Sequence, residues 1–380
     1  MNYSGKYLTI IFLLIGFLFL YQPLEGQIVF GQPPSGEIKF IYQSWTITET
    51  SDAETTLNQW VLPVYGFVPV RDNVEIIFTS STAGASRDVG DDDISLTGLN
   101  DSRVAVYASF FEDRVLLGAG INLPTGKKSL DSDEIGVVNW LTESFLNFPI
   151  KNYGEGFGAT IEAGYARTFD AFSFGGGASY LLKTAYEPLE GIEDYKPGNM
   201  LRLAAFGTAQ RDQFWGRLSL VYSIYGEDKL DGTSLFKDGD IFDLTAEFRF
   251  SQDRISALLG LREIVRGKDK RIISGELNTE PEKSHGAETR IYGETVYRVT
   301  ERIGLKGLLD YQYVAANGYA DDHPRSFGSS NYFGFGAGVT GSFYEMFRGV
   351  AEFEYFTGSA DDDILDLSGW QFIIGVGASF

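Results

Sequence analysis

The sequence predicts an all-β protein, a transmembrane antiparallel up-and-down β-barrel of about 14–16 strands with a short helix in one long extracellular loop. Three observations lead to this fold class. Apolar and polar residues alternate along strand-length segments throughout the chain. Short turns alternate with long polar loops, and the composition combines 15% aromatic residues with 45 glycines. This mixture suits aromatic girdles and closely packed barrel walls.

The first 26 residues are expected to be a signal peptide. Lys6 precedes the apolar run Tyr7–Leu20, and Gly26 stands at a plausible cleavage position. The run is short for a bilayer span and a proline follows it, so an uncleaved anchor is the weaker alternative. We expect residues 27–380 to form the outer-membrane barrel.

Composition excludes several classes of function. The chain has no cysteine, so it forms no disulfide and no thiolate metal site. Its formal net charge of -21 disfavours nucleic acid as a partner, because phosphates would be repelled. Nucleotide-binding glycine motifs with the required spacing and context are also lacking. No cofactor and no metal are predicted.

The strands are predicted from alternation with a period of two. In segment 241–250 the apolar face consists of Phe242, Leu244, Ala246, Phe248 and Phe250, and the polar face of Asp243, Thr245, Glu247 and Arg249. A slip of one residue would expose these charges to lipid, at a cost of roughly 2–4 kcal/mol each at mid-depth. Segments 217–225 and 347–356 divide in the same way.

The breaks between strands are of two kinds. Tight turns are expected at 71–73, 112–114, 169–172, 210–213, 251–254, 300–302 and 344–346. Long polar loops are expected at 84–93, 127–153, 186–199, 226–239, 266–286, 317–328 and 358–367. This asymmetry is typical of outer-membrane barrels, whose short turns face the periplasm. Roughly sixteen strands result, or fourteen if segment 37–72 is misread; a secreted β-propeller is the rival architecture.

The C-terminal segment "WQFIIGVGASF" is predicted to be the last strand. Trp370, Phe372, Ile374, Val376, Ala378 and Phe380 share one oily face. That face is expected to meet lipid, and Phe380 resembles the terminal insertion signal of outer-membrane barrels.

The inward faces of the strands are expected to line a wet lumen. A barrel of about sixteen strands is wide enough for an aqueous channel. The charged residues predicted to line it are Glu75, Arg103, Glu162, Arg202, Arg217, Asp243, Glu247, Arg249, Arg262, Glu294, Lys306, Asp310, Arg348, Glu352 and Glu354. The simpler alternative is that these charges only pair across the wall and stiffen it.

The longest break contains a predicted helix. Asp131 or Ser132 could cap it, and Pro149 would end it. Its apolar residues are Ile135, Val138, Trp140, Leu141, Phe145, Leu146 and Phe148. Such a helix needs a place to bury its apolar face. It is expected either to fold over the pore mouth as a substrate gate or to pack on a neighbouring loop.

Catalytic chemistry is poorly supported. The two histidines stand in predicted outer loops, and Ser284 with His285, or Ser326 with His323, could be nominated for a lipid hydrolase. Solvated loop histidines are the preferred interpretation, so no catalytic residue is predicted. The acidic runs Asp91–Asp93 and Asp361–Asp363 could bind calcium, but they lack the spacing of a calcium loop.

One segment resembles a known family. In "GLNDSRVAVYASFFEDRVLLGAGINLPTGKKSL", Gly98 to Leu130, a "GLxD" strand is followed by a strand ending in "LPTGK". This pattern resembles the outer-membrane barrels grouped with the meta-pathway phenol-degradation proteins, which are distantly similar to the long-chain fatty acid transporters. The resemblance implies transport of small hydrophobic or aromatic compounds. Few residues precede the first strand, so a plug is expected to come from outer loops.

The sequence therefore predicts a bacterial outer-membrane channel for passive uptake of small hydrophobic or amphipathic molecules, with both termini in the periplasm. A general diffusion porin, a lipid hydrolase and a surface structural protein are the alternatives. Expected partners are outer-membrane lipid and lipopolysaccharide, the barrel-insertion machinery and a small-molecule solute.

Overall fold

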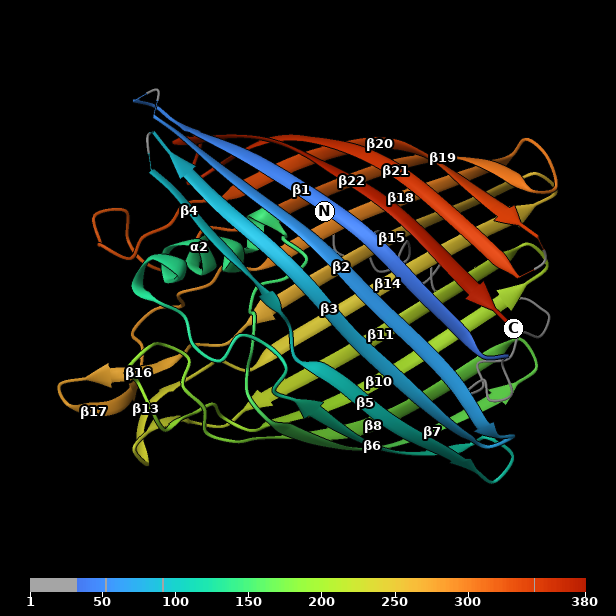
Figure 1. Cartoon of the computed structure of the whole chain (residues 1–380), viewed down its shortest axis with the longest axis horizontal. Coiled ribbons are helices and arrows are strands. Elements are labelled where there is room, and N and C mark those ends of the chain that lie inside the picture. Colours follow the sequence, from blue (N-terminus) through green and yellow to red (C-terminus); the bar gives the residue numbers. More distant parts are fainter. Residues whose placement is uncertain (1–32, 52, 91, 345) are drawn as a thin grey trace, which may run out of the picture.

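The chain forms a closed antiparallel barrel of sixteen strands, which confirms the predicted fold class (Figure 1). The computed structural model describes residues 33–51, 53–90, 92–344 and 346–380. The predicted signal peptide, residues 1–26, lies outside the described residues. Within the described part of the chain, no helix is both long and apolar enough to cross a membrane.

The wall strands follow each other in chain order. The first eight are β1 (Ser35–Glu49), β2 (Glu54–Arg71), β3 (Val74–Val89), β4 (Asp92–Leu99) continued by β5 (Ser102–Phe110), β6 (Val115–Leu123), β7 (Gly158–Phe169), β8 (Phe172–Lys183) and β10 (Met200–Arg211). The next eight are β11 (Phe214–Tyr225), β14 (Ile241–Gln252), β15 (Ile255–Arg266), β18 (Glu288–Arg298), β19 (Ile303–Val314), β20 (Ser330–Phe343), β21 (Phe347–Ala360) and β22 (Leu365–Ser379).

The first and last strands close the barrel. Ser35 of β1 pairs with Ser379 of β22, and Glu49 pairs with Leu365 at the other end of the seam. The Phe380 amide donates to the Pro34 carbonyl at 2.9 Å. Both ends of the described chain therefore lie at the end of the barrel that carries the short turns (Figure 1).

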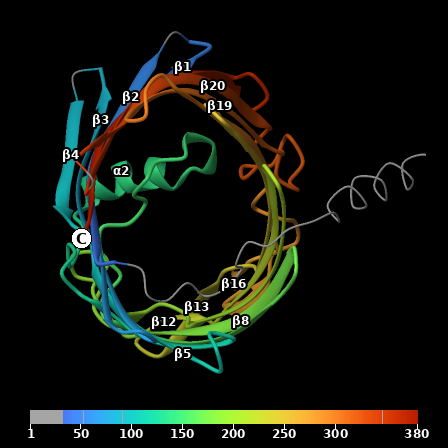
Figure 2. The same ribbon diagram turned by 90° about the vertical axis from the view of Figure 1, so that its right-hand side faces the viewer.

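The fourth wall strand is interrupted. β3 pairs with β4 along Thr82–Val89 and with β5 along Val74–Thr79, so β4 and β5 together make one strand with a break after Leu99. β5 also pairs with β6, whereas β4 has only β3 as a strand partner in the described chain. The chain that follows β6 leaves the wall and enters the barrel (Figure 2).

The outer surface is an apolar belt, as alternation predicts. On β14, Phe242 and Phe248 are exposed on the outside, while Asp243, Glu247 and Arg249 occupy the alternate positions. Exposed apolar side chains of this kind recur on β15, β19, β20, β21 and β22. Apart from the free edge of β4, the wall strands of the described chain are paired on both sides, so the barrel can present such a belt to lipid without exposing backbone polar groups.

Two of the predicted long loops are wrong. Segments 84–93 and 358–367 belong mostly to extended hairpins, because β3 continues to Val89 and β21 to Ala360. The acidic residues that led to the prediction of long loops lie at the ends of these strands and at the tips of the two hairpins. Asp361, Asp362 and Asp363 all have positive φ, a conformation that aspartate adopts in turns more readily than most residues.

Three of the five remaining long loops build a second sheet at the opposite end from the short turns, an element that the sequence analysis missed. Its five strands are β9 (Tyr195–Lys196), β12 (Asp228–Leu230), β13 (Thr233–Lys237), β16 (Lys270–Ile273) and β17 (Glu276–Thr279). They come from three different loops, so backbone pairing ties these loops together (Figure 1). We call this end of the barrel the long-loop end.

Candidate functional site

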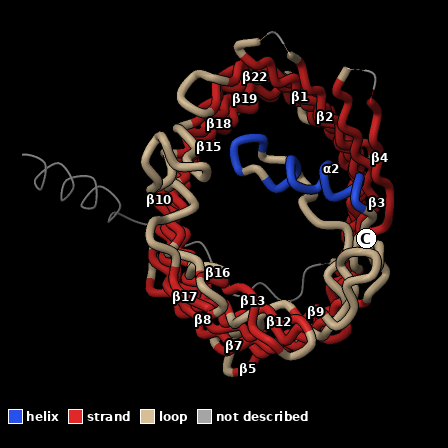
Figure 3. Tube along the Cα trace, turned by 90° about the vertical axis from the view of Figure 1, so that its left-hand side faces the viewer, coloured by secondary structure: helices blue, strands red, loops and turns tan. Residues whose placement is uncertain are grey.

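The segment between β6 and β7 lies inside the barrel (Figures 2 and 3). We call residues 131–153 the inserted segment. It begins with helix α2 (Ser132–Thr142), whose N-cap Asp131 accepts from the amides of Asp133 and Glu134, while the Glu134 carboxylate accepts from the Asp131 amide. This reciprocal capping box starts the helix at the predicted residue.

The helix ends earlier than predicted. It stops at Thr142, not at Pro149, and a 3-10 turn η1 (Ser144–Leu146) follows. Asn147 then adopts a left-handed conformation with φ 48°, which redirects the chain. Phe145 and Leu146 therefore reach the wall from a separate turn rather than from the helix face.

The motif that resembles the transporter family lies where the chain leaves the wall, just before the inserted segment. The Thr125 hydroxyl accepts from the Ser102 amide at 2.9 Å and donates to the Asn100 carbonyl at 3.0 Å. The Asp101 carboxylate accepts from the amides of Gly126 at 2.9 Å and Glu155 at 2.7 Å. Asp101, at the break between β4 and β5, thus joins the residues that lead into the inserted segment to those that follow it.

Lys127, the last motif residue, is bound by the inserted segment itself. Its ammonium group forms an ion pair with Glu134, whose side chain is buried at the first turn of α2. Leaving this carboxylate without its cationic partner would carry a desolvation penalty. The pair therefore fixes the direction in which the helix enters the lumen.

Three wall glutamines hold the backbone of the inserted segment. Gln43 of β1 donates to the Leu146 carbonyl at 2.9 Å, and Gln312 of β19 donates to the Ser144 carbonyl at 2.8 Å. Gln59 of β2 donates to the Ile150 carbonyl at 2.6 Å and accepts from the Ile150 amide at 3.0 Å. Irregular backbone placed inside a barrel needs such partners, because each orphaned buried group costs about 1–3 kcal/mol.

The inserted segment buries its apolar side chains against the inner wall. The resulting cluster, here called the wall core, lies in the long-loop half of β1 to β4 and β19 to β22. Its fully or nearly fully buried members are Trp45, Ile47, Leu57, Val61, Ala83, Ala85, Leu96, Val137, Leu141, Phe145, Leu146, Phe148, Tyr153, Val314, Tyr332, Phe356, Ala360 and Leu367. Ring contacts such as Trp45 with Phe356, at 5.2 Å between centroids, order it further.

The predicted gate residues occupy different environments within this arrangement. Leu141, Phe145 and Phe148 are buried in the wall core, whereas Ile135, Val138 and Trp140 are half-buried. Val137, which the prediction left out, is fully buried because the face of α2 that meets the wall is centred on Glu134, Val137 and Leu141. The hydrophobic periodicity alone did not show that a charged residue shares the buried face.

Figure 3 shows the inserted segment within the opening of the barrel, on one side of it. Its apolar side chains pack mainly against the barrel wall, a contact that neither predicted placement of the helix included. One loop residue takes part: Phe327 stacks on Phe145 with centroids 5.7 Å apart. The role of these residues as a gate stays a prediction.

Ion pairs line another part of the interior, here called the charged wall. They join Arg103 to Glu162 at 2.6 Å, Arg262 to Asp243 at 2.5 Å, Arg290 to Asp310 at 2.5 Å and Lys306 to Glu294 at 2.8 Å, and Lys306 also contacts Glu352. Most of the predicted lumen residues are in this network, which supports the simpler alternative that charges pair across the wall.

The other predicted lumen residues have weaker or different contacts. Glu247 accepts from the Tyr292 hydroxyl at 2.9 Å, while Arg249 lies 5.6 Å from the Trp215 ring. Arg348 and Glu354 share the face of β21 that carries Glu352. Glu75, on β3, has a buried carboxylate oxygen that makes no hydrogen bond within the described part of the chain.

Sequence reasoning missed Arg290 and Tyr292 of β18, which contribute to the charged wall. They were detectable, because they alternate in step with Glu294, a residue that was assigned to the lumen. Tyr107 was missed for another reason. Its hydroxyl donates to Glu162 at 3.2 Å, a contact between β5 and β7 that no local pattern predicts.

The serine and histidine pairs nominated for a hydrolase are arranged differently from a catalytic pair. The Ser284 hydroxyl donates to Glu280, and His285 lies 3.7 Å from Asp269. His323 stacks on Tyr319, and its Nδ1 accepts from the Arg325 amide at 3.1 Å. Among the described residues, no serine hydroxyl is hydrogen-bonded to either imidazole.

The buried carboxylates beside His285 tie the loop sheet to the barrel. Asp269 is 1% exposed and accepts from the Gly239 amide at 2.9 Å. Burial raises the pKa of Asp269, but hydrogen bonds from His285, Gly239 and Arg271 outweigh it and hold the pKa below the ordinary value. Burial has the opposite outcome at Asp238, whose pKa is raised by desolvation and by Asp228 and Asp269.

The acidic run Asp361–Asp363 binds protein groups instead of presenting open oxygens. Asp361 accepts from the Gly328 amide at 2.6 Å, and Asp362 accepts from the amide and hydroxyl of Ser329. These bonds hold the pKa of Asp362 below its ordinary value. The run fastens loop 315–329 to the β21–β22 hairpin. In the other run, Asp91 lies outside the described residues.

Comparisons with known proteins give no family assignment. No family model matches the sequence, and no curated protein matches it. A solved structure of OpdK from Pseudomonas aeruginosa with vanillate is 10% identical, with 91% of this chain and 99% of that chain covered and a TM-score of 0.44.

Two monoaromatic hydrocarbon channels are similar at the same level. A TodX deletion mutant is 8% identical, covering 92% of this chain and 91% of that chain with a TM-score of 0.47. CymD is 12% identical, covering 92% and 89% with a TM-score of 0.42. These likenesses concern the barrel architecture and carry no argument about function, so the family resemblance stays a prediction.

Proposed function

We propose that the protein is a passive outer-membrane channel for small hydrophobic or amphipathic molecules, aromatic ones among them, and that the inserted segment is its constriction. In this proposal the long-loop end faces the exterior and both termini lie in the periplasm. Solutes move down their gradient, and the chain's own residues supply only shape, charge and an apolar surface.

The observation that carries the proposal is the one-sided placement of the inserted segment. It is bonded to β1, β2 and β19 by glutamines and joined at both ends through Asp101. A sixteen-stranded barrel encloses an aqueous interior, and a segment held against one side narrows it without filling it. The charged wall then borders the remaining passage.

An apolar surface at the edge of the wall core supports amphipathic solutes. A recess of about 140 Å³ lies between the end of α2 and the long-loop end, lined by Asn139, Trp140, Glu143, Phe327 and Leu365. The half-buried Trp140 presents a ring there. The recess is too small to enclose a solute, but its rings offer a contact for the aromatic part of a solute before it passes the charged wall.

The apolar belt and the terminal strand support the remaining expectations. The belt on the outside of the wall suits contact with outer-membrane lipid and lipopolysaccharide. Phe380 is 67% exposed, so its ring is accessible to the barrel-insertion machinery. A general diffusion porin is the second candidate, favoured by the ion pairs of the charged wall.

Single-channel conductance in a planar bilayer tests the proposal. The refolded protein would be measured with and without small neutral aromatic solutes such as benzyl alcohol. We expect channels whose current flickers and falls when the solute is added. Steady large currents that ignore the solute would identify a general porin, and the absence of any channel would overturn both candidates.

A further inference from the structure

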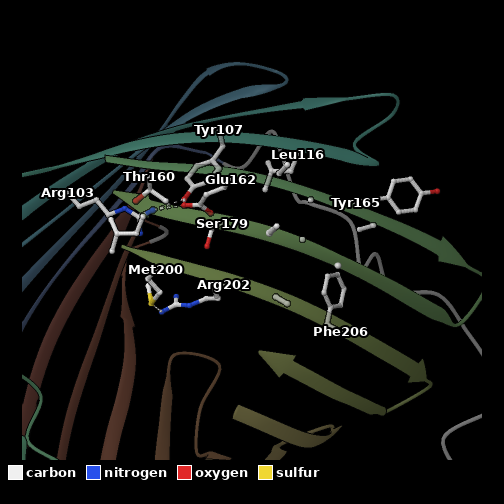
Figure 4. A pocket seen from close by; sticks show the side chains of 18 of the residues that line it. Arg103, Tyr107, Leu116, Thr160, Glu162, Tyr165, Ser179, Met200, Arg202 and Phe206 are labelled. Atoms are coloured by element: carbon white, nitrogen blue, oxygen red, sulfur yellow. Dashed lines mark hydrogen bonds and ion pairs between the residues drawn. The ribbon is translucent and has the colours of Figure 1, made fainter. Parts of the chain in front are cut away.

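A second recess lies on the inner wall of β5, β6, β7, β8 and β10, away from the wall core (Figure 4). Its volume is about 510 Å³, within the range of roughly 300–1,000 Å³ that is usual for small-molecule sites. Arg103, Tyr107, Glu162, Arg202 and Phe206 border it.

Glycines make this recess possible. A Cβ atom at Gly175 would lie 2.7 Å from atoms of the Phe206 ring, and one at Gly118 would lie 2.6 Å from the Tyr107 ring. Both rings therefore rest on bare backbone, which no larger residue would permit. The two rings therefore lie flat against the wall and leave the space on their inner side open.

The charges in the recess are unequally matched. Glu162 is bonded to Arg103 at 2.6 Å and to the Tyr107 hydroxyl at 3.2 Å, so its charge is compensated. Arg202 has a different environment. Its guanidinium approaches the Met200 sulfur at 3.9 Å, and no carboxylate of the described chain lies within ion-pair distance.

A second guanidinium reinforces this imbalance. Arg217 of the neighbouring strand β11 lies 6.0 Å above the Phe206 ring, again without a carboxylate of the described chain at ion-pair distance. By contrast, Arg262 and Arg290 of the charged wall each hold an aspartate at 2.5 Å. Two arginines without an ion pair in the described chain therefore place positive charge beside this recess, although Glu247 lies opposite Arg217 in the β11–β14 register.

We propose that this recess binds small aromatic carboxylates, with the carboxylate on Arg217 and the ring against Phe206, while Arg202, six positions away along the β10–β11 pairing, adds positive charge. The inference rests on the proposed function, since the ligand reaches the recess through the lumen. A guanidinium recognises a carboxylate with two parallel hydrogen bonds, which a neutral hydroxyl cannot reproduce. The aromatic surface adds a contact that an aliphatic acid as small as acetate cannot make.

Calorimetric titration of the refolded protein in detergent tests the inference without any measurement of current. The probes are benzoate, acetate and benzyl alcohol at neutral pH, where both acids are ionised. We expect benzoate to bind at least about tenfold more tightly than either of the others, because only benzoate carries both the charge and the ring.

Matched variants locate the binding. Arg202→Gln together with Arg217→Gln should weaken benzoate binding about tenfold, while Arg249→Gln, a lumen arginine outside the recess, should leave it unchanged. Phe206→Leu should reduce benzoate binding and spare acetate. Equal benzoate affinity in the double arginine variant and in Arg249→Gln would overturn the inference, as would equal binding of acetate and benzoate.

The two proposals fail separately. A barrel that carries no current but binds benzoate through Arg217 would contradict the channel and support the recess. A barrel with solute-sensitive channels and no benzoate binding would support the channel and overturn the recess.

Discussion

The wall core and the charged wall are built on strands of the same barrel, yet their inward residues have opposite characters. On β1 the inward positions near the long-loop end are Gln43, Trp45 and Ile47, all almost fully buried. On β14 the inward positions are Asp243, Glu247 and Arg249, which face the interior. The first set meets the inserted segment and the second meets water.

The difference shows that an inward position in this barrel has two possible environments. Alternation divides each strand into an outer and an inner face, but it does not say whether the inner face meets solvent or protein. A glutamine such as Gln43 suits an inner face that meets protein, because its side-chain amide can hydrogen-bond the backbone of the inserted segment within an apolar cluster. The predictions below test whether the two regions are independent.

The largest effect is expected from a charge placed in the wall core. Leu141→Asp puts an unpaired carboxylate at a fully buried position, at a cost of about 4 kcal/mol or more. The inserted segment should leave the wall, so single-channel conductance should rise severalfold and proteases should cleave within 131–153. Asn139→Asp, an exposed position on the same helix, is the control. An intact segment in Leu141→Asp would contradict the role of the wall core.

A smaller effect is expected when ring contacts are removed. Phe145→Ala deletes a buried ring, which costs about 3–5 kcal/mol, and Trp140→Ala removes the ring at the apolar recess. The double variant should raise conductance and lose the response to benzyl alcohol. The exposed α2 substitution Asp133→Asn should change neither property. Unchanged single-channel current in the double variant would exclude the inserted segment as the constriction.

The charged wall should respond in selectivity rather than in conductance. Lys306 contacts both Glu294 and Glu352, so Lys306→Met leaves two carboxylates without their cation. The zero-current potential in a salt gradient should move toward cation preference, while the inserted segment stays in place. Lys306→Arg should keep the original potential. A protease-sensitive segment in Lys306→Met would show that the two regions are coupled.

The smallest effect concerns pH at the loop sheet. The pKa of Asp269 is depressed, so its ionised form adds stability above the ordinary aspartate value of 3.8, and this stability is lost as pH falls through the depressed pKa. Asp238, with a raised pKa, acts in the opposite sense and lowers stability as pH rises above 3.8.

Hydrogen exchange at the Gly239 amide, which donates to Asp269, should therefore show faster opening in strong acid. Asp269→Asn should remove this acid-dependent increase in exchange at Gly239, while the amides of the inserted segment remain protected. An increase of the same size in Asp269→Asn would contradict the conclusion that protonation of Asp269 causes the opening.

Much of the barrel could be predicted because its signals are local. The alternation of Phe242 with Asp243 and the cap at Asp131 each depend on residues close in sequence, and the structure bears out both. The extended hairpins were missed because acidic residues at strand ends resemble loop composition. The three-loop sheet was missed because short strands with partners in other loops carry no periodicity of their own.

For the candidate site, the sequence predicted many of the residues that take part but not which residues they contact. The apolar residues in segment 132–148 indicate that this segment is buried against another surface. They do not identify that surface, because it is assembled from β1 to β4 and β19 to β22. Similarly, Arg103 and Glu162 are recognisable as lumen charges, whereas their pairing requires the register of β5, β6 and β7. Whether Arg202 would lack such a partner is a property of the closed wall.

The glutamine bonds to the inserted segment also order events during assembly. Gln43 lies 103 positions before the residue it binds, and Gln312 lies 168 positions after its partner. Contacts this distant in sequence form late, because the loop between the partners must close first. The segment emerges between β6 and β7, while its surroundings come from both ends of the chain. The full set of contacts around the segment therefore exists only once both β1 and β22 are in place.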